Sequence, residues 1–482
     1  MAVEKSLPDK YGHFNEWYNE IVARAKLVDI RFGVKGFIVY RPAIMYIINR
    51  IYDVYERELQ ATGHEPCLFP VVIPNSSFKK EAEHIKGFEQ EVFWVTRAGE
   101  HELEEPMLLR PTSETAMYPM YALWIRSYKD LPLKLYQNGS VYRYETKATK
   151  PLLRGREFLW IEAHDVHRTE NDALKQVHED MRIAEKVLYE ELGLPFLLLQ
   201  REEFDKFAGA VTTNAFEVLF PDKEVVQIAT THYLGTNFSK PFNITYLDEK
   251  GVAKHPHQTC YGPGISRIAA SVICIHGDDY GLILPFEAAP IQVIIVPIPI
   301  KQAVKDVLAK CRELEKDLVK AGLRIKLDDS DATPGEKFYK WELLGVPVRL
   351  EVGPKELAEG AVTVFRRDTR ERFKVKNEDL IKNILDLKEK LLKALRDKAE
   401  KFLNENMHKA ETKHELIKIA KEKGGIIRVN YCGNNECADL IKAETGGFEV
   451  RGKRIDVNEI PDGPCVWCGE KAERVVYVAK AY

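Results

Sequence analysis

The 482-residue sequence has no long apolar run, and its N-terminal stretch has no apolar core typical of a secretory signal. The longest apolar stretch, residues 291–300, is about half as long as a membrane-spanning helix and contains two prolines. Both absences argue against a secreted or membrane-embedded protein. We therefore expect a cytoplasmic protein with no membrane partner.

An excess of positive charge is also missing. The net charge is −3, from 71 Lys and Arg against 74 Asp and Glu. A protein that coats DNA uses a global positive field, so we expect no DNA partner. Recognition of RNA through local basic patches stays open.

Cysteine is scarce, with eight residues in the chain, of which four stand singly. Such a distribution argues against a disulfide framework. The other four form two pairs, Cys432-x4-Cys437 and Cys465-x2-Cys468. Four thiolates in two close pairs are typical of a structural zinc site with no open position for catalysis. The alternative is a set of reduced structural cysteines.

The expected fold class is α+β, with the chain in four parts. In residues 1–288 the strand candidates follow one another without regular helical crossovers, which predicts an antiparallel sheet flanked by helices. Residues 289–376 alternate strands and helices and predict a small α/β domain. Residues 377–423 are rich in Lys, Glu and Leu and predict a charged, solvated helical connector, with a partner-binding helix as the alternative. Residues 424–482 hold the paired cysteines and predict a small zinc-binding α+β domain.

Several local elements follow from periodicity and capping. Residues 42–59 place apolar side chains on one face of a helix, and a second helix starts after Thr169 as its N-cap. A helix is also expected over residues 301–321. The strand candidates are residues 67–74, 224–233, 242–248, 281–287, 291–299, 323–329, 346–353 and 361–368.

The segment from Val141 to Trp160, "VYRYETKATKPLLRGREFLW", brings Arg143, Arg154 and Arg156 between two apolar strands. Partly desolvated guanidinium groups are costly unless anions meet them. One interpretation is a hairpin in which the two glutamates of the segment form salt bridges. The other is a cradle for a polyphosphate, because guanidinium groups bind phosphate oxygens in pairs and remain charged.

A second candidate for anion binding lies in "QTCYGPGISRIAASV", residues 258–272. Gly262 and Gly264 precede Arg267 and a helical pattern. Glycines allow a ligand to approach the backbone closely, and a helix N-terminus favours an anion. An ordinary turn with a surface arginine is the alternative.

These segments resemble a known enzyme class. "GHEPCLFP" (residues 63–70), Arg143-x-Glu145, and Gly262-x-Gly264 followed by Arg267 resemble motifs 1, 2 and 3 of class II aminoacyl-tRNA synthetases, in that order. "RPTSETAMYPMY", "GREFLWIEAHDVH" and "THYLGTNFSK" are similar to the prolyl-tRNA synthetase family in its archaeal and eukaryotic cytoplasmic form. The resemblance covers almost the whole chain.

The resemblance implies a class II catalytic domain over residues 1–288 that activates L-proline with ATP and transfers it to the 3′ end of tRNA(Pro). Arg143 would meet the α-phosphate and the substrate carboxylate, and Arg154 and Arg267 the terminal phosphates. Phe158 would stack on adenine, and Mg²⁺ would bridge the phosphates. The implied ATP site comprises Arg143, Glu145, Arg154, Phe158, Gln227, Thr230 and Arg267.

The resemblance also implies a proline pocket, in which the carboxylate of Glu114 suits the secondary ammonium and Trp160 suits the apolar ring. The implied set is Thr112, Glu114, Arg143, Trp160, Glu162, His164, His232, Cys260 and Gly262. By chemistry alone, "TSE" is also a helix N-cap, and single histidines are commonly core or surface residues. His164 and His167 lack the carboxylate spacing of a metal site.

For residues 289–376 the resemblance implies an anticodon-binding domain. Glu342 and Arg349 would read guanines, since arginine grips O6 and N7 and a carboxylate accepts from N1 and N2. Arg366, Arg367 and Arg370 would contact phosphates. A solvated charged face is the alternative interpretation.

Further implications concern assembly and the chain end. Motif 1 implies a homodimer, and the stretch around Tyr482 is expected to pack back toward the catalytic domain. Only some 60 residues separate motif 2 from Gln227, so we expect no editing insertion. The third motif has Ser266-Arg267 where many class II enzymes have Glu-Arg, so no motif-3 glutamate is assigned. The competing interpretations are a related enzyme such as a threonyl-tRNA synthetase, and an RNA-binding or regulatory zinc protein on a degenerate synthetase scaffold.

Overall fold

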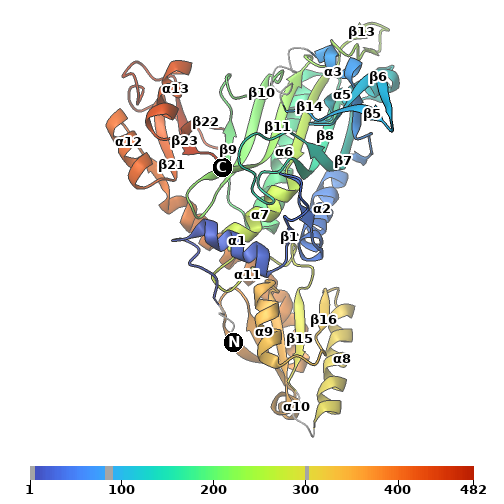
Figure 1. Cartoon of the computed structure of the whole chain (residues 1–482), viewed down its shortest axis with the longest axis vertical. Helices are drawn as coiled ribbons and strands as arrows, with labels where there is room; N and C mark the ends of the chain where they lie inside the picture. The colour runs from blue at the N-terminus through green and yellow to red at the C-terminus, as the bar shows by residue number, and fades with distance from the viewer. Residues whose placement is uncertain (1–5, 82–90, 299–302) are drawn as a thin grey trace.

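The computed structural model describes residues 6–81, 91–298 and 303–482. Three lobes make up the molecule (Figure 1): a large N-terminal lobe, an α/β lobe at the lower end of the long axis, and a C-terminal lobe at the upper left. Within the described residues, none of the helices combines the length and apolar character needed to cross a bilayer.

A single long sheet forms the centre of the molecule and continues from the N-terminal lobe into the C-terminal lobe. Its neighbours are antiparallel except for the pairs β20–β21 and β3–β7. This confirms the expected antiparallel sheet. In spatial order the strands are β20 (Met407–Lys409), β21 (Ile426–Tyr431), β23 (Arg474–Lys480), β22 (Phe448–Arg454), β9 (Leu197–Gln200), β10 (Thr212–Leu219), β11 (Val225–Gly235), β14 (His257–Pro263), β8 (Glu157–His167), β7 (Leu133–Tyr142) and β3 (Glu65–Pro66).

Helices cover one face of this sheet. The predicted helix over 42–59 is α2 (Pro42–Ala61), and its apolar stripe packs on α7 (Ile265–His276) in the main core. The helix expected after Thr169 is α6 (Glu170–Ala184), and the Thr169 side chain accepts a hydrogen bond from the Asp172 N–H. It continues as a π-helical segment, η3 (Glu185–Glu191), and α1 (Phe14–Arg24) packs into the same core.

Three expected strands of the N-terminal lobe, residues 67–74, 242–248 and 281–287, are wrong in extent or in kind. Of residues 67–74, only β4 (Val72–Pro74) is a strand, because Pro70 and the Cys67 contact with Tyr136 leave an irregular segment. Residues 281–287 form no strand. Leu282 and Leu284 instead donate backbone hydrogen bonds to Leu343 and Gly345 of the α/β lobe.

The N-terminal lobe also contains a separate three-stranded sheet and several connecting elements. β4 pairs with β6 (His101–Leu109), which pairs with β5 (Trp94–Ala98). Of the expected strand over 242–248, only β12 (Tyr246–Leu247) forms. The other elements are β1 (Val28–Asp29), β2 (Val39–Tyr40), β13 (Ala253–Lys254), α3 (Asn75–Phe78), α5 (Glu114–Trp124) and the 3₁₀ turns η1 (Lys79–Glu81) and η2 (Tyr128–Asp130).

The α/β lobe has the expected alternation. β15 (Val293–Pro297) is buried and pairs in parallel with β16 (Ile325–Leu327) and β17 (Val348–Val352). β18 (Ala361–Arg366) and β19 (Arg372–Lys376) add antiparallel strands. Its helices are α8 (Val304–Lys320), α9 (Pro334–Leu343) and α10 (Pro354–Glu359). The first two residues of the helix expected from 301, and residue 299 of the expected strand, lie outside the described residues.

The predicted connector is the long helix α11 (Leu380–Glu405), preceded by the 3₁₀ turn η4 (Asn377–Asp379). One face of this helix is apolar and buried: Leu380, Ile384 and Leu391 lie in the core formed by the α/β strands. The first half of this helix is thus part of the α/β lobe rather than a solvated linker. The C-terminal lobe follows, with α12 (Lys413–Glu422) and α13 (Asn435–Glu444) beside its strands.

The seam between the N-terminal and C-terminal lobes is a strand pair. In it, Lys453 and Arg454 of β22 stand opposite Gln200 and Leu199 of β9. Gly452 has φ +118°, and a Cβ there would lie 2.1 Å from the carbonyl oxygen of Gln200. Only glycine fits this close approach, so the seam fixes the C-terminal lobe against the strands that carry the candidate site (Figure 1).

Candidate active site

A cavity of about 240 Å³ lies on the central sheet, on the face opposite α2 and α7. Alternation along the strands sets this division: Tyr261 of β14 packs against Tyr55 of α2, whereas its neighbours Cys260 and Gly262 line the cavity. The structure brings most of the predicted site residues together here. The lining includes Thr112, Glu114, Arg143, Phe158, Trp160, Gln227, Thr230, His232, Cys260, Gly262 and Arg267.

The end of strand β7 and the first turn of helix α7 supply the two arginines Arg143 and Arg267 of the cavity. Arg143 follows β7, and its Nε donates to the carbonyl oxygen of Pro111 at 3.0 Å. Arg267 lies in the first turn of α7, where Nε donates to Leu153 O and Nη1 to Gln227 O, both at 3.0 Å. Burial, followed by the positive charges of Arg143 and Arg154, lowers the pKa of Arg267 to about 10. Converging cations of this kind are stabilised when an anion binds between them.

Aromatic rings border the same guanidinium groups. The guanidinium carbon of Arg143 lies 5.4 Å from the ring centroid of Phe158 and 5.3 Å from that of Trp160. The two rings are neighbours, with centroids 5.5 Å apart. Gly262 gives Trp160 its place, since a Cβ at Gly262 would lie 3.0 Å from the indole. The arrangement offers a flat apolar surface beside a positive charge.

Carboxylates occupy the other end of the cavity. Ser113 is the N-cap of α5, and Glu114 is its first residue. The Thr112 hydroxyl lies 2.5 Å from Glu114 Oε2 and 3.0 Å from Glu162 Oε1. Glu162 also accepts the Ser113 backbone N–H at 3.0 Å. Burial would raise the pKa of Glu162, but His164, Ser113 and Arg110 lower it to about 2, so the carboxylate stays ionised.

Two buried histidines belong to this part of the site, and their pKa values are shifted in opposite directions. Burial disfavours the charged form of His164, yet Cys260, Glu162 and Glu114 raise its pKa well above the usual value. Burial, followed by the positive charge of His164, lowers the pKa of His232 to about 3, so His232 is neutral. Thr213 and Thr230 hold the His232 ring at 2.9 and 3.0 Å.

Glu145 and Arg154 stand beside the cavity rather than among its lining residues. Arg154 Nε is 3.9 Å from Glu145 Oε2. Arg154 also donates a hydrogen bond to the carbonyl oxygen of Tyr482, and Lys150 donates one to the Tyr482 hydroxyl. The stretch around Tyr482 therefore packs back on the Val141–Trp160 hairpin, as expected.

Some functional residues were missed by sequence reasoning. Arg201, Lys206 and Phe207 line the cavity from the segment after β9, and Arg451 lines it from β22 of the C-terminal lobe. A charged residue on its own carries no signal of this role. The contact arises from the pairing of β9 with β22, strands about 250 residues apart, as in the hydrogen bond from Arg201 to the Arg451 carbonyl.

Glu342 and Arg349 lie together in the α/β lobe, on α9 and β17. Arg349 Nη1 donates to Glu342 Oε1 at 2.8 Å, and the guanidinium carbon lies 3.8 Å from the ring centroid of Phe338 and 4.1 Å from that of Phe365. Arg367 is fully buried and donates to Asp278. The expected phosphate contact of Arg367 is therefore wrong, because its guanidinium joins the α/β lobe to the N-terminal lobe.

The four paired cysteines converge in the C-terminal lobe. Cys432 Sγ lies 3.7 Å from the sulfur of Cys437 and 3.7 Å from that of Cys468, and Cys465 completes the cluster. Zn–S bonds of 2.3 Å at tetrahedral angles would place the sulfurs about 3.8 Å apart. The sulfur geometry therefore fits a tetrathiolate zinc site.

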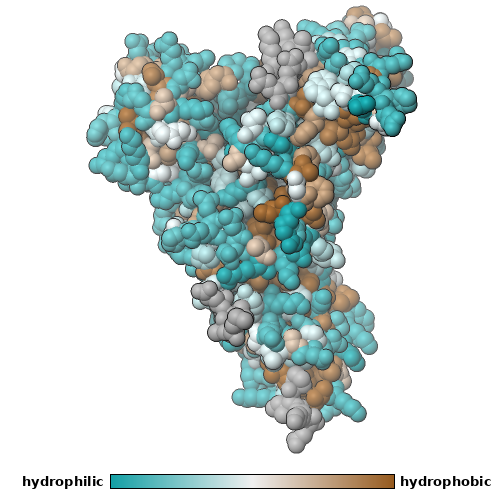
Figure 2. All heavy atoms as spheres, viewed as in Figure 1, coloured by the Kyte–Doolittle hydropathy of each residue, from teal (hydrophilic) through white to brown (hydrophobic). Residues whose placement is uncertain are grey.

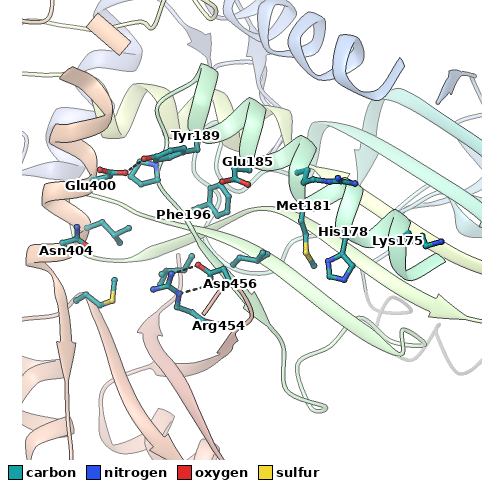
Figure 3. A pocket seen from close by; sticks show the side chains of 16 residues that line it. Lys175, His178, Met181, Glu185, Tyr189, Phe196, Glu400, Asn404, Arg454 and Asp456 are labelled. Atoms are coloured by element: carbon teal, nitrogen blue, oxygen red, sulfur yellow. Dashed lines mark hydrogen bonds and ion pairs between the residues drawn. The ribbon is translucent and has the colours of Figure 1, made fainter. Parts of the chain in front are cut away.

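A larger hollow of about 860 Å³ lies between α6, η3, β9 and α11 (Figure 3). Arg454 and Asp456 form an ion pair on its C-terminal side, and Tyr189 hydrogen-bonds to Glu400 across it. None of the predicted site residues lines it. Although this hollow is larger than the cavity on the central sheet, its size alone does not indicate a comparable chemical function.

An arginine-bearing antiparallel hairpin, beside a strand that runs through two glycines into a helix with Arg267 in its first turn, defines a class II aminoacyl-tRNA synthetase. Family models agree. Residues 93–276 match the tRNA synthetase class II core domain (G, H, P, S and T), residues 292–387 the anticodon binding domain, and residues 414–482 the prolyl-tRNA synthetase C-terminal model.

Similar proteins narrow the class. The chain is 53% identical to a proline–tRNA ligase of Thermofilum pendens over 100% of both chains. It is 44% identical to a proline–tRNA ligase of Methanopyrus kandleri over 97% of this chain and 96% of the relative. The Giardia lamblia prolyl-tRNA synthetase in complex with prolyl-adenylate is 37% identical and superposes with a TM-score of 0.95, covering 99% of this chain and 100% of the other. The chain belongs to the prolyl-tRNA synthetase family.

Proposed function

We propose that the protein activates L-proline with ATP to prolyl-adenylate and pyrophosphate, and transfers the prolyl group to the 3′ end of tRNA(Pro). The observation that carries this proposal is the pairing of Arg143 and Arg267 with Glu114 in one cavity, in a chain of this family. The test is charging of a tRNA(Pro) transcript with labelled proline. Charging that depends on ATP supports the proposal, and no charging of any transcript would contradict it.

In the first step, a carboxylate oxygen of proline attacks the α-phosphorus of ATP and pyrophosphate leaves. Glu114 binds the secondary ammonium, and the Trp160 indole contacts the ring. Arg143 meets both the carboxylate and the α-phosphate, because its guanidinium lies beside Trp160 and Phe158. No enzyme nucleophile is required, so positioning and charge stabilisation supply the catalysis.

The nucleotide then extends from Phe158, which stacks on the adenine, toward Arg267 and Arg154. Burial, followed by the positive charges of Arg143 and Arg154, lowers the pKa of Arg267, and phosphate oxygens bound beside it offset both effects. Gln227 and Thr230 contact the nucleotide from β11, and Glu145 contacts the adenine from the hairpin. Mg²⁺ arrives with ATP as a phosphate-bound ion that neutralises charge on the leaving pyrophosphate.

In the second step, a terminal ribose hydroxyl of the tRNA attacks the carbonyl carbon of the adenylate and AMP leaves. Glu342 and Arg349 of the α/β lobe read guanines of the anticodon. Their hydrogen bond and the two flanking phenyl rings hold the guanidinium in one orientation. In this structure Nε and Nη2 of Arg349 donate to Glu351 and Nη1 donates to Glu342, so the guanidinium exchanges these carboxylates for O6 and N7 of guanine when the anticodon binds.

The C-terminal cysteines hold a structural Zn²⁺. The four side chains that would bind it are Cys432, Cys437, Cys465 and Cys468. Cys432 precedes α13, Cys437 lies in its first turn, and Cys465 and Cys468 lie in the loop before β23, so the ion joins the start of α13 to that loop. The chain is divided into the four domains given above. The protein is located in the cytoplasm, where thiols stay reduced.

The protein acts as a homodimer through the face that carries the Gly63–Pro70 segment. Large apolar side chains are exposed there or nearby, including Tyr46 at 61% and Leu68 at 80%. Figure 2 shows apolar surface gathered over the region of α2 and β7. Such patches commonly mark interfaces. Light scattering is expected to give twice the mass of one chain for the wild type and a monomer for Tyr46→Arg. A wild-type monomer at micromolar concentration would contradict the dimer.

A further inference from the structure

The C-terminal lobe reaches the active-site cavity at Arg451 of β22. The register of β22 on β23 shifts between Val450 and Gly452, which places Arg451 in a bulge. A bulge aims a side chain away from the regular alternation of a strand. Gly452, the next residue, allows the backbone to approach Gln200 of β9. The seam between the lobes thus directs Arg451 toward the catalytic strands, where β22 lies beside β9 in Figure 1.

A buried carboxylate receives Arg451. Its Nε donates to Glu217 Oε1 at 3.1 Å, and Glu217 of β10 is 1% exposed. Arg201 donates to the same oxygen from the other side, and its Nη1 donates to the Arg451 carbonyl at 2.6 Å. Burial alone would raise the pKa of Glu217, but Arg201 and Arg451 lower it to about 2. The carboxylate is therefore a charged bridge between two guanidinium groups that belong to different lobes.

The same chain of contacts ends at Gln227 of β11. Glu217 and Gln227 are cross-strand partners in the β10–β11 register. Arg201 Nη2 donates to Gln227 Oε1 at 2.7 Å. A guanidinium group has only donors, so the amide oxygen of Gln227 must face Arg201. This orientation leaves the Gln227 N–H groups for a ligand in the cavity, where Arg267 also holds the Gln227 carbonyl.

We propose that Arg451, Glu217 and Arg201 are a positioning relay that keeps the Gln227 amide turned to donate to bound ATP, so that docking of the C-terminal lobe is a condition of nucleotide binding. The inference deepens the proposed function and rests on it. The guanidinium groups of Arg201 and Arg451 donate to Glu217, Gln227 and Glu449. They act through Gln227 rather than by contact with the substrate.

The test is a double-mutant cycle in the full-length protein, measured by proline-dependent ATP–pyrophosphate exchange. Arg451→Gln is expected to raise the KM for ATP about tenfold, the size expected for loss of charged hydrogen bonds, and to leave the KM for proline within about twofold. In a Gln227→Ala background the same change is expected to add almost nothing, because no amide remains to be positioned. An unchanged ATP KM in Arg451→Gln, or effects that multiply in the double variant, would overturn the relay.

Arg454→Gln is the matched control. Arg454 lies on the same strand, pairs with Asp456 and lines the other hollow, as Figure 3 shows. Its ATP KM is expected to equal that of the wild type, and a rise as large as that of Arg451→Gln would overturn the relay as a specific path. Arg451→Lys keeps the charge without the planar fork and is expected to give an intermediate ATP KM. If Arg451→Gln does not fold, Arg451→Lys takes its place in the cycle, with the same two overturning results.

The two levels of the proposal fail in different ways. A wild type without proline-dependent exchange contradicts the proposed function. An active wild type whose Arg451 variants keep the normal ATP KM contradicts only the relay.

Discussion

Arg154 donates a hydrogen bond to the carbonyl oxygen of Tyr482, so the hairpin predicted to hold ATP is anchored by the far end of the sequence. The Tyr482 hydroxyl also accepts from Lys150, and its backbone N–H donates to Val225 of β11 at 3.0 Å. Its ring packs on Phe220. One residue thus joins the cationic hairpin to the strand that carries Gln227.

Removal of Tyr482 tests this anchor. The hairpin would lose the contacts at Lys150 and Arg154, so we expect the KM for ATP to rise roughly tenfold while the KM for proline stays unchanged, given about 1–1.5 kcal/mol for the lost hydrogen bonds. Steady-state pyrophosphate exchange with each substrate varied measures both constants. If the KM for ATP is the same with and without Tyr482, the contact between Tyr482 and the hairpin does not contribute to ATP binding.

Glu114→Gln tests the ammonium contact. The amide keeps the size of the side chain and removes its negative charge, so the KM for proline is expected to rise about 10- to 100-fold, the range for loss of a charged hydrogen bond. The ATP constant is expected to change little. Glu102→Gln on the exposed part of β6 serves as the control. If Glu114→Gln has the same KM for proline as the Glu102→Gln control, Glu114 does not bind the substrate ammonium.

Cys468→Ser tests the tetrathiolate. Purified wild-type protein is expected to contain one zinc per chain, and the variant less than half of that, because a hydroxyl is a poor substitute for a thiolate. The thermal midpoint of the variant is expected to fall as the ion is lost. Cys67→Ser, at a half-buried cysteine outside the cluster, is the control. Full zinc occupancy in Cys468→Ser would exclude the assignment.

Asp180 gives a pH-dependent stability. Burial, followed by the negative charge of Asp165, raises the pKa of Asp180 to about 7, from 3.8 in an exposed carboxyl. The folded state therefore holds a proton that the unfolded state releases, and this stabilisation is complete below pH 4 and is lost as the pH rises to 7. The Asp180→Asn variant has no carboxyl group to ionise at this position, so it does not lose this stabilisation. The thermal midpoint of the variant minus that of the wild type is therefore expected to increase by about 3 °C or more from pH 4 to pH 8.

Differential scanning calorimetry in buffers at pH 4, 6 and 8 measures the difference. Thr231 and Gln176 donate hydrogen bonds to Asp180, and rotation of their side chains lets them hydrogen-bond to the asparagine amide of the variant. Parallel pH profiles of the two proteins would show that Asp180 is ionised in the folded state.

Arg349→Gln separates the two steps of the reaction. The α/β lobe is remote from the cavity, so pyrophosphate exchange is expected to stay at the wild-type rate. Charging of tRNA(Pro) is expected to lose roughly 10- to 100-fold in kcat/KM, since a bidentate contact to guanine contributes about 1–3 kcal/mol. Wild-type pyrophosphate-exchange activity of the variant shows that it is folded. If the variant charges tRNA(Pro) as well as the wild type does, Arg349 does not recognise the anticodon guanines.

Local patterns predicted a large part of this architecture. The stripe of α2, the N-cap at Thr169 and the glycines before α7 are signals within one turn or one strand, and each has the predicted structure. Because the Val141–Trp160 hairpin and the Gly262–Arg267 segment resemble family motifs, their convergence on one cavity was also expected.

The parts that could not be predicted depend on distant pairings. Arg451 reaches the cavity only because β22 joins β9, and the sequence around it has no motif that indicates a ligand. The buried stripe of α11 looked like a solvated connector because Lys and Glu cover its other face. Arg367 stands in a run of arginines that suggests an exposed basic surface, yet Asp278 of the N-terminal lobe binds it inside the molecule.

ATP–pyrophosphate exchange across the twenty amino acids tests the central claim most directly. In the proposed function, recognition of proline rests on Glu114 and on the shape of a pocket bounded by Trp160, since the substrate side chain has no hydrogen-bonding group. Exchange is expected to be strongest with proline, with alanine and cysteine as weak substrates because apolar size differences contribute only about 1–3 kcal/mol. Exchange that is strongest with another amino acid, or absent with all twenty, would contradict the account.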